Sequence, residues 1–576
     1  MMKLSCVVGF NDCLKLFLQG RFKDWLQDRV KGKDTSTPSI KGRLALRGWL
    51  RQSKRVLPCL LVLKLILCSL ALSNFTFSNF AHSAPPKPIS FHVTEFKLIG
   101  TTPLSTKETT IILKPFANKD YTLSELQKAT NSIEQAIRQK GFAFYRVILP
   151  PQSLAEGKVS LEVISFSLGQ INIRGNEHFE GDNISAALPG FTPGESPNTK
   201  ILAAQLKIAN RHPSKQLNLT FKQSSDADLI DANLDVQDQK PLKLSLITNN
   251  SGTDQTGKSR VTTAAQYTNL WNRDHIVNAS YTTSPGHVSD VTQLGLSYVA
   301  PFYPLNAWLT SYYAYSNVDS GVVANDFTVS GSGRIYGFHY LQYLPRIQSY
   351  EHWLDVGIDN RLFDNDIRFL KTPIGVDVRS VPYSLLYRGE YALNSTRLDF
   401  NIQWVQNTSL DNKNSDSEYA NTRFGADNNW NLIRYGFSIK SSIATNWVLS
   451  AELTSQYSDE PLISGEQLGI GGSSSVRGYE ERETGADRGE VLNLELYFPK
   501  WNKATFLVFA DYGHGHMAKA QPGEKANWDI SSVGVGTRWQ WRNKLFLNLD
   551  WAVALADGPE TDDTDNHIHA TLALSL

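Results

Sequence analysis

The fold is decided by the stretch Leu545-Phe-Leu-Asn-Leu-Asp-Trp-Ala-Val-Ala-Leu555, in which every odd-numbered residue is apolar. Successive side chains of a β-strand point to opposite faces, so this stretch predicts a strand with one continuous apolar face. Asn548 and Asp550 lie between the apolar residues, which makes the opposite face more polar. The same period of two continues almost without interruption from Pro241 onward.

Sixteen segments share this alternation. Many have about 9–11 residues, the length that a tilted membrane-spanning strand needs, and several are longer. The segments are 242–249, 259–269, 274–283, 290–300, 305–316, 331–344, 350–361, 379–392, 396–406, 429–441, 446–457, 490–499, 504–512, 529–541, 544–555 and 567–576.

The connections between these segments distinguish a membrane barrel from a soluble sandwich. After every even-numbered segment the turn is very short, as at Asn272-Arg273, whereas loops after many odd-numbered segments are long and polar, as at 407–428 and 458–489. Outer-membrane barrels combine short periplasmic turns with longer outer loops. We therefore predict a 16-stranded transmembrane β-barrel over 241–576, with an exported soluble β-protein as the alternative.

The first 83 residues differ from the rest of the chain and read as a targeting segment. Basic residues precede an apolar run over 56–72, and Ala81-His82-Ser83 offers small residues for cleavage. A single transmembrane anchor is the alternative, but Lys64 interrupts the run, which falls short of the ~20 apolar residues of a span. We predict an N-terminal extension and a signal peptide over 1–83, and the extension is either real or an incorrectly assigned start.

Charge and cysteine content exclude several classes of protein. Residues 1–83 carry a net charge of +10, so the remainder holds 43 basic and 52 acidic side chains. A mildly acidic body argues against nucleic-acid binding. Because Cys6, Cys13, Cys59 and Cys68 all precede residue 84, the mature chain has no disulfide, no cysteine-ligated metal and no thiol catalysis.

Two small mixed modules are predicted before the barrel, over 89–165 and 166–240. The first contains an alternating run that stops at Gly100 and a helix that a Thr122-x-x-Glu125 capping box opens and Gly141 closes. Two strands follow that helix, at 142–149 and 158–164.

The second module repeats this pattern. Ile171-x-Ile173 leads to Gly175, in register with Leu98-x-Gly100 after a shift of 75 positions. A helix capped by Asn198 and two further strands, 217–222 and 232–236, complete the module. Each module is thus a β-α-α-β-β unit, and this pattern by itself indicates two generic α+β domains.

Two motifs in the barrel half carry a family resemblance. The first is Val476-Arg477-Gly478-Tyr479 in the loop after the eleventh segment, and the second is Phe506-x-x-Phe509-x-Asp511-x-Gly513 at the thirteenth. With two preceding modules that resemble POTRA domains, they resemble the outer-membrane insertase and two-partner secretion superfamily over residues 89–576. The number of POTRA-like modules is two, and in this the chain resembles the two-partner secretion transporters of the hemolysin secretion type.

The resemblance implies that Arg477, at the tip of a loop folded into the barrel, pairs with Asp511 on the inner wall. The alternation agrees, since a carboxylate is costly against lipid and Asp511 should therefore face the lumen. An ordinary exposed loop arginine is the alternative. Family members commonly have an N-terminal plug helix before the first POTRA domain, but too few residues follow residue 83 for one here, so the 458–489 loop is expected to seal more of the pore.

The resemblance implies a translocator that captures an exported, unfolded partner protein through its periplasmic POTRA domains and secretes it through the barrel. The partner is expected to be a large β-helical exoprotein, and the surrounding lipid that of a Gram-negative outer membrane. An assembly factor that inserts other barrels is the alternative function. A passive porin would not need the modules.

Catalysis has no support in the sequence. No Gly-x-Ser-x-Gly elbow or phosphate-binding glycine loop is present. The pairs His514-x-His516 and His567-x-His569 have no third ligand at a recognisable spacing, so neither predicts a metal site. We expect no enzymatic activity, cofactor, metal or nucleotide.

Overall fold

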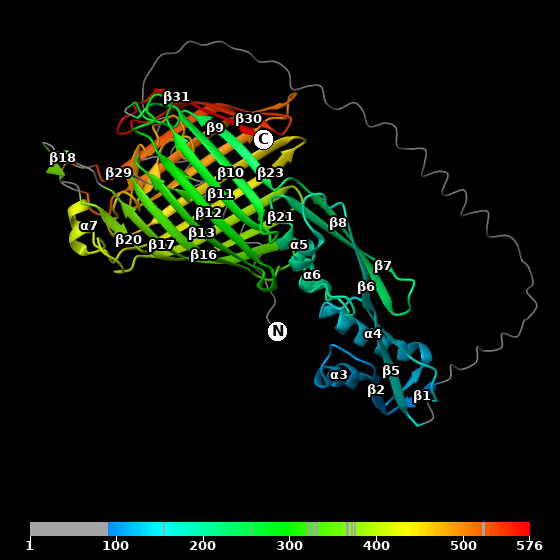
Figure 1. Ribbon diagram of the computed structural model, residues 1–576. Coiled ribbons are helices and arrows are strands. Elements are labelled where there is room, and N and C mark those ends of the chain that lie inside the picture. The colour runs from blue at the N-terminus through cyan, green and yellow to red at the C-terminus, as the bar shows by residue number, and fades with distance from the viewer. Residues whose placement is uncertain are drawn as a thin grey trace, which may run out of the picture. The chain divides into compact units, whose positions relative to one another are not determined.

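The computed structural model describes residues 90–576 except 154–155, 255, 319–321, 324–326, 329–331, 365–367, 370–371, 374–375, 521–522 and 524. The predicted extension and signal peptide lie outside the described residues. Figure 1 shows two small α+β modules, blue and teal, followed by a barrel that runs from green to red. Among the described helices, none has the length and apolar character needed to cross a membrane.

The first module contains a three-stranded sheet of order β2-β5-β4, covered by helices. Its helix α4 buries Leu126, Ile133 and Ile137 against Val159 and Leu161 of the sheet. The predicted Thr122–Glu125 capping box opens this helix. The elements are β1 (Ser90–Val93), β2 (Glu95–Ile99), α3 (Thr106–Leu113), η1 (Lys114–Phe116), β3 (Lys119–Thr122), α4 (Leu123–Gln139), β4 (Tyr145–Ile148) and β5 (Lys158–Ser165).

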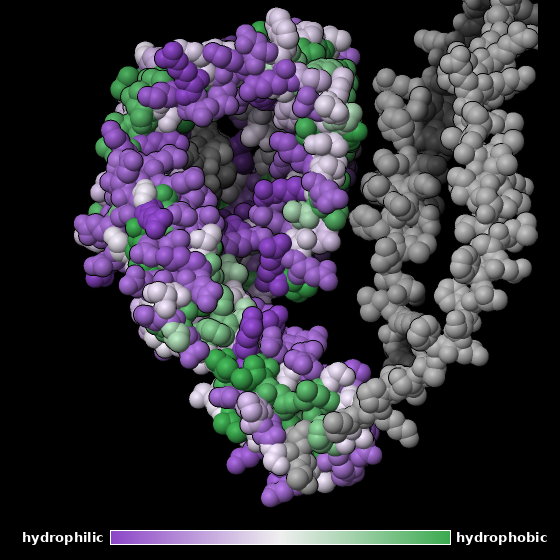
Figure 2. All heavy atoms as spheres, turned by 90° about the vertical axis from the view of Figure 1, so that its right-hand side faces the viewer, coloured by the Kyte–Doolittle hydropathy of each residue, from purple (hydrophilic) through white to green (hydrophobic). Residues whose placement is uncertain are grey.

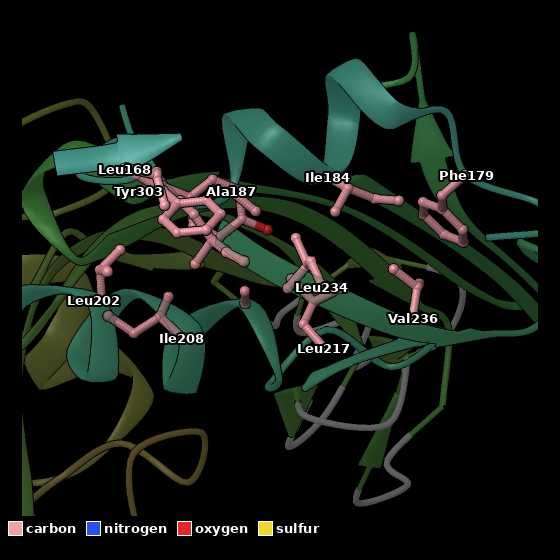
Figure 3. Packing of buried hydrophobic residues seen from close by; sticks show 14 of the residues in the cluster. Leu168, Phe179, Ile184, Ala187, Leu202, Ile208, Leu217, Leu234, Val236 and Tyr303 are labelled. Atoms are coloured by element: carbon pink, nitrogen blue, oxygen red, sulfur yellow. The ribbon is translucent and has the colours of Figure 1, made fainter. Parts of the chain in front are cut away.

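The second module repeats the arrangement with a sheet of order β6-β8-β7. Figure 3 shows Ile184 and Ala187 of its helical layer above Leu217, Leu234 and Val236 of the sheet. The predicted cap is present, because the Asn198 side chain accepts hydrogen bonds from two backbone amides at the start of α6. The elements are β6 (Ser167–Arg174), α5 (Gly181–Ala186), α6 (Thr199–Ala209), β7 (Lys215–Gln223) and β8 (Leu229–Asp238).

Gly100 and Gly175 occupy equivalent positions in the two modules. Their φ angles are +92° and +80°, in the left-handed region that favours glycine. A Cβ atom at Gly100 would lie 2.4 Å from the Val163 carbonyl oxygen, and one at Gly175 would lie 2.5 Å from that of Val236. The 75-residue repeat seen in the sequence therefore reflects the same tight turn in both modules.

The remaining strands form one closed antiparallel barrel, in which β31 pairs with β9 to complete the circle. This confirms the predicted 16-stranded barrel, with β20 and β21 counted as one interrupted strand. The strands are β9 (Leu242–Asn249), β10 (Arg260–Leu270), β11 (His275–Thr283), β12 (Gln293–Phe302), β13 (Ala307–Ser316), β16 (Gly333–Tyr343), β17 (Tyr350–Phe363), β20 (Val378–Ser380), β21 (Tyr383–Leu393), β22 (Thr396–Gln406), β23 (Asn431–Ala444), β24 (Trp447–Tyr457), β27 (Arg488–Tyr497), β28 (Ala504–His516), β29 (Asn527–Trp541), β30 (Leu545–Ala554) and β31 (Asn566–Ser575).

The predicted strand 379–392 is in fact interrupted at Val381–Pro382, and both of its parts pair with β17. Proline has no amide hydrogen for the ladder, and the Val381 amide donates to the Asn407 side chain instead. Several long loops contain structure that alternation does not predict. These are the hairpins β14–β15 (Val322–Val323, Phe327–Thr328), β18–β19 (Arg368–Phe369, Thr372–Pro373) and β25–β26 (Leu468–Ile470, Thr484–Ala486), and the helix α7 (Asp416–Thr422).

Alternation along the strands separates an apolar outer face from a polar inner one. On β17, for example, Val356 and Ile358 point outward and are 52% and 45% exposed, whereas Asp359 is buried inside. Figure 2 looks into a hollow bounded largely by hydrophilic residues, with hydrophobic residues along the outer margins. The outer face is the one that meets lipid.

The second module is joined to the barrel by a buried polar cluster, which we call the module junction. The Lys215 ammonium donates to Asp274 Oδ2 at 2.6 Å and to Asn183 Oδ1 at 2.7 Å. Tyr303, in the barrel turn η2 (Tyr303–Leu305), donates its hydroxyl to Asp274 Oδ2 at 2.5 Å and completes the module's apolar core (Figure 3). Barrel turns therefore supply part of the interior of the second module.

Candidate functional site

The loop between β24 and β27 folds back into the barrel. Its two sides pair as the β25–β26 hairpin, and the segment between them carries the Val476–Tyr479 motif. Ile470, Val476 and Tyr479 pack with Val491 and Ile530 of the wall, and all five are at most 4% exposed. Burial of these side chains holds the hairpin against the inner wall.

Arg477 and Asp511 meet inside the barrel. The guanidinium donates from Nε to Asp511 Oδ2 at 2.7 Å and from Nη2 to Oδ1 at 2.8 Å. The Arg477 amide also donates to Oδ2, at 3.2 Å. Two parallel bonds between a guanidinium and a carboxylate fix orientation as well as position, so the contact holds the loop tip in one place on β28.

Three further wall residues surround the Arg477 guanidinium. Nη1 donates to Glu495 Oε1 at 2.8 Å, and Asp550 Oδ2 lies 3.8 Å from Nη1. The guanidinium carbon lies 3.5 Å from the centre of the Phe509 ring, in a cation–π contact. The arginine is therefore enclosed by carboxylates from β27, β28 and β30.

Gly478 and Tyr479 fit the loop tip to the wall. Gly478 has a φ of +95°, and a Cβ atom there would lie 3.3 Å from Ala552 Cβ, so both backbone conformation and space favour glycine. The Tyr479 hydroxyl, which lies 3.0 Å from the Ser531 carbonyl oxygen and 2.7 Å from that of Ala556, donates to these acceptors. The motif thus contacts β28, β29 and β30 together.

The second motif divides between the two faces of β28. Phe509, Asp511 and Gly513 face the loop, and a Cβ atom at Gly513 would lie 2.5 Å from Ile470 and 2.9 Å from Val476. Gly513 therefore leaves the space that the loop occupies. Phe506 is on the outer face, 40% exposed, and the structure does not bring it to the site.

The sequence did not assign Asn493, Glu495, Asp550 or His569 to this site, although all four belong to it, and His569 was considered only as a metal ligand. Asn493 Nδ2 donates to Asp511 Oδ1 at 2.8 Å and to the Ser475 carbonyl at 2.6 Å. The Gly478 amide donates to His569 Nε2 at 3.1 Å. Alternation places these residues on the polar face of their strands, but polarity alone does not distinguish them from the other residues of that face.

The site contains cations, carboxylates and amides that bind one another through hydrogen bonds and ion pairs. Arg538 donates to Asp550 at 2.6 and 2.9 Å, so two guanidinium groups face three carboxylates. Each charge has a close partner, as a buried network requires. The chemistry of the cluster is attachment of a loop to a wall.

The fold and this site define a class of protein: an outer-membrane β-barrel transporter with periplasmic POTRA domains and a loop held inside the barrel. The family of haemolysin secretion/activation proteins ShlB/FhaC/HecB matches residues 229–539, and the ShlB-type POTRA domain matches 91–165. The chain belongs to this family.

Curated relatives and solved structures agree with this assignment. The chain is 22% identical to the outer membrane transporter CdiB of Dickeya dadantii, over 81% of this chain and 83% of that relative. It is 20% identical to the heme/hemopexin transporter protein HuxB of Haemophilus influenzae, over 80% and 82%. The fold resembles that of CdiB from Escherichia coli, with a TM-score of 0.68 at 17% identity, over 87% of this chain and 93% of that structure. The chain is thus a two-partner secretion transporter that moves a partner protein across the outer membrane, with its POTRA domains in the periplasm.

Proposed function

We propose that the two modules capture the partner protein in an extended state and deliver it to the barrel, whose loop tip is held by Arg477 until transport. The observation that carries this proposal is a loop placed inside a polar barrel, with its tip attached to the wall by one compact cluster. The domains that act in turn are 89–165, 166–240 and 241–576, with 1–83 serving export of the chain itself.

Capture uses the free edges of the module sheets. In the described part of the chain, β2 and β4 are the edge strands of the first sheet and β6 and β7 those of the second, and each pairs with the central strand only. An extended partner adds to such an edge through backbone hydrogen bonds, a mode that tolerates many sequences. Because no nucleotide is available in the periplasm, folding of the partner at the cell surface drives export. A large β-helical exoprotein fits this mechanism, since its folding can proceed step by step as the chain emerges at the cell surface and so favours further export.

Deletion of residues 168–238 tests capture. We expect loss of partner export while the barrel still inserts, because the alternation that specifies the barrel begins only at Leu242. Insertion is checked by the heat-dependent change in gel mobility of the folded barrel. Export at the wild-type level would show that the second module is not needed for capture.

A strain without this gene tests the transport function itself. Mass spectrometry of the growth medium should show loss of one large protein, and a plasmid copy of the gene should restore it. Circular dichroism of that protein then tests the β-helical expectation. An unchanged set of secreted proteins would contradict the function. The proposal assigns no enzymatic activity to the chain.

A further inference from the structure

Glu466 belongs to the same loop as Arg477 but contacts other residues of the barrel wall. It is fully buried, and its Oε2 accepts a hydrogen bond from Arg361 Nη1 at 2.7 Å. Its Oε1 accepts one from the Ser380 hydroxyl, also at 2.7 Å. Its backbone carbonyl accepts from Gln456 Nε2 at 3.0 Å. A carboxylate without water must be paired to remain charged, and here both oxygens are.

The wall side of this contact is organised independently of the loop. Arg361 Nη2 donates to Asp359 Oδ2 at 2.7 Å. Asp359 Oδ1 accepts from the Tyr312 hydroxyl at 2.6 Å and lies 3.1 Å from His339 Nε2. Arg361 is therefore held by Asp359 of its own strand, which residues of β13 and β16 hold in turn. Removal of Glu466 would leave this wall network with its other partners in place.

The two loop contacts lie on different parts of the barrel. Arg361 and Ser380 belong to β17 and β20, whereas Asp511 and Glu495 belong to β28 and β27. In the order of the sheet, β21, β22, β23 and β24 stand between these two pairs of strands. Glu466 also meets the intervening strands, because Gln456 of β24 donates to its backbone carbonyl and Arg434 of β23 lies 3.8 Å from its carboxylate. The loop is therefore attached to the inner wall through two different sets of residues, by a cation on the loop at its tip and by an anion on the loop nearer its start.

We propose that Glu466 is a second positioning residue for this loop, and that both the Arg361–Glu466 contact and the Arg477–Asp511 contact must be released before the loop leaves the lumen. The signs of the charges support two separate contacts. The carboxylates that bind Arg477 would repel the Glu466 carboxylate. Arg361, which binds Glu466, would repel the Arg477 guanidinium. Neither loop residue can therefore take the place of the other. Each contact thus stabilises one end of the loop only.

Glu466→Gln is the direct test, with the purified full chain in a planar lipid bilayer. The substitution keeps size but removes the negative charge, so the hydrogen bond that Arg361 donates to the side-chain oxygen no longer joins two opposite charges. We expect the fraction of time spent in conducting states to rise on the order of tenfold, the loss expected for one hydrogen bond between charged groups. Glu466→Asp keeps the charge on a shorter side chain and should restore part of the wild-type behaviour.

Glu481→Gln is the matched control. Glu481 lies on the same loop, but its Oε1 accepts hydrogen bonds from the amide and hydroxyl of Ser473, which is also on the loop. The same chemical change there should leave conductance unaltered. If Glu466→Gln prevents insertion, Ser380→Ala replaces it, since this change removes one hydrogen bond to Glu466 and no charge. Its effect should have the same sign and be smaller.

Combination with Arg477→Ala separates two contacts from one. If the two contacts are independent, the double variant should show the product of the two single effects, whereas an effect no larger than that of the stronger single variant would make them one contact. Wild-type conductance in Glu466→Gln and Ser380→Ala, with no increase over Arg477→Ala when either is combined with it, would overturn the proposal. These measurements involve no partner protein, so their outcome is independent of whether the modules capture one.

Discussion

Two of the buried pairs of a cation and a carboxylate in the described part of the chain differ in the balance of charge around them: the pair at the module junction and the pair at the loop tip. At the module junction, Lys215 and Asp274 are 0% and 1% exposed, and neutral Asn183 and Tyr303 supply the other bonds. In the barrel, Arg477 and Asp511 are 5% and 0% exposed, but Glu495 and Asp550 add further negative charge. At the junction one positive charge meets one negative charge, whereas Arg477 has further carboxylates to which it can donate.

This difference corresponds to what each pair joins. A buried lysine with one carboxylate and one amide oxygen as partners suits a permanent attachment, because loss of the single carboxylate would leave the ammonium without a counter-charge. An arginine among three carboxylates can lose one partner and keep another, and its charge persists at any accessible pH. We infer that the second module stays attached to the barrel while the loop is the part that moves.

Asp274→Ala should have the largest effect. It leaves the Lys215 ammonium buried without a carboxylate, and removal of one partner from such a pair costs ~3–5 kcal/mol. We expect rapid hydrogen exchange throughout β7 and protease cleavage between the second module and the barrel. Lys222→Ala on the same strand is the control, because Lys222 is 49% exposed and 3.8 Å from Asp231. Equal effects of the two variants would show that the junction pair contributes no more than a surface pair.

Arg477→Ala and Asp511→Ala should have intermediate effects. Lumen water reduces the cost of an unpaired charge, so we expect about half of the ~3–5 kcal/mol of a dry pair. Each variant should insert normally but export less partner, and the double variant should be little worse than either single one because both remove the same contact. Export and conductance of the three variants measure this. Fully additive defects would mean that the two residues act independently.

The two pairs should also respond differently to alkaline pH. Burial lowers the pKa of the Lys215 ammonium below its ordinary value of 10.5, although Asp274 opposes this shift. Between the lowered pKa and 10.5 the unfolded state binds more protons, so the stability of the junction should rise as the pH is raised through that window.

Hydrogen exchange of β7, corrected for the intrinsic effect of pH, measures this dependence. His212 and Tyr303 are further titratable groups close to the Lys215 ammonium. Lys215→Met is therefore the necessary control, and it should remove the rise of stability with pH. An identical pH dependence in wild type and Lys215→Met would assign it to another group. The attachment of the loop should not change over the same pH range, because Arg477 stays charged. Channel conductance measures this attachment.

Two tyrosine substitutions should give the smallest effects. Tyr303→Phe removes the hydroxyl that donates to Asp274, and Tyr479→Phe removes the one that donates to two backbone carbonyls. Each should cost about 1 kcal/mol, the net value of one hydrogen bond. Tyr303→Phe should weaken only the junction, measured by exchange in β7, and Tyr479→Phe should raise only conductance. An effect of either variant at the other region would show that the two regions are coupled.

Much of the fold could be predicted because it depends on local patterns. Alternation marks each barrel strand, since one face must meet lipid along its whole length. The Thr122–Glu125 box and the Asn198 cap mark helix starts, because their partners lie within the next three residues. The interruption at Pro382 was missed, although proline is a local signal, because the alternation continues on both sides of it.

The sequence by itself determined the barrel, the two modules and the pairing of Arg477 with Asp511, the last through resemblance to a family with both motifs. Only the tertiary structure decided that Glu495 and Asp550 complete that cluster, that Glu466 reaches Arg361, and that Lys215 meets Asp274. The physical reason is separation along the chain. A period of two assigns a charged side chain to the lumen, but the closure of the barrel and the path of the loop determine which opposite charge it meets there.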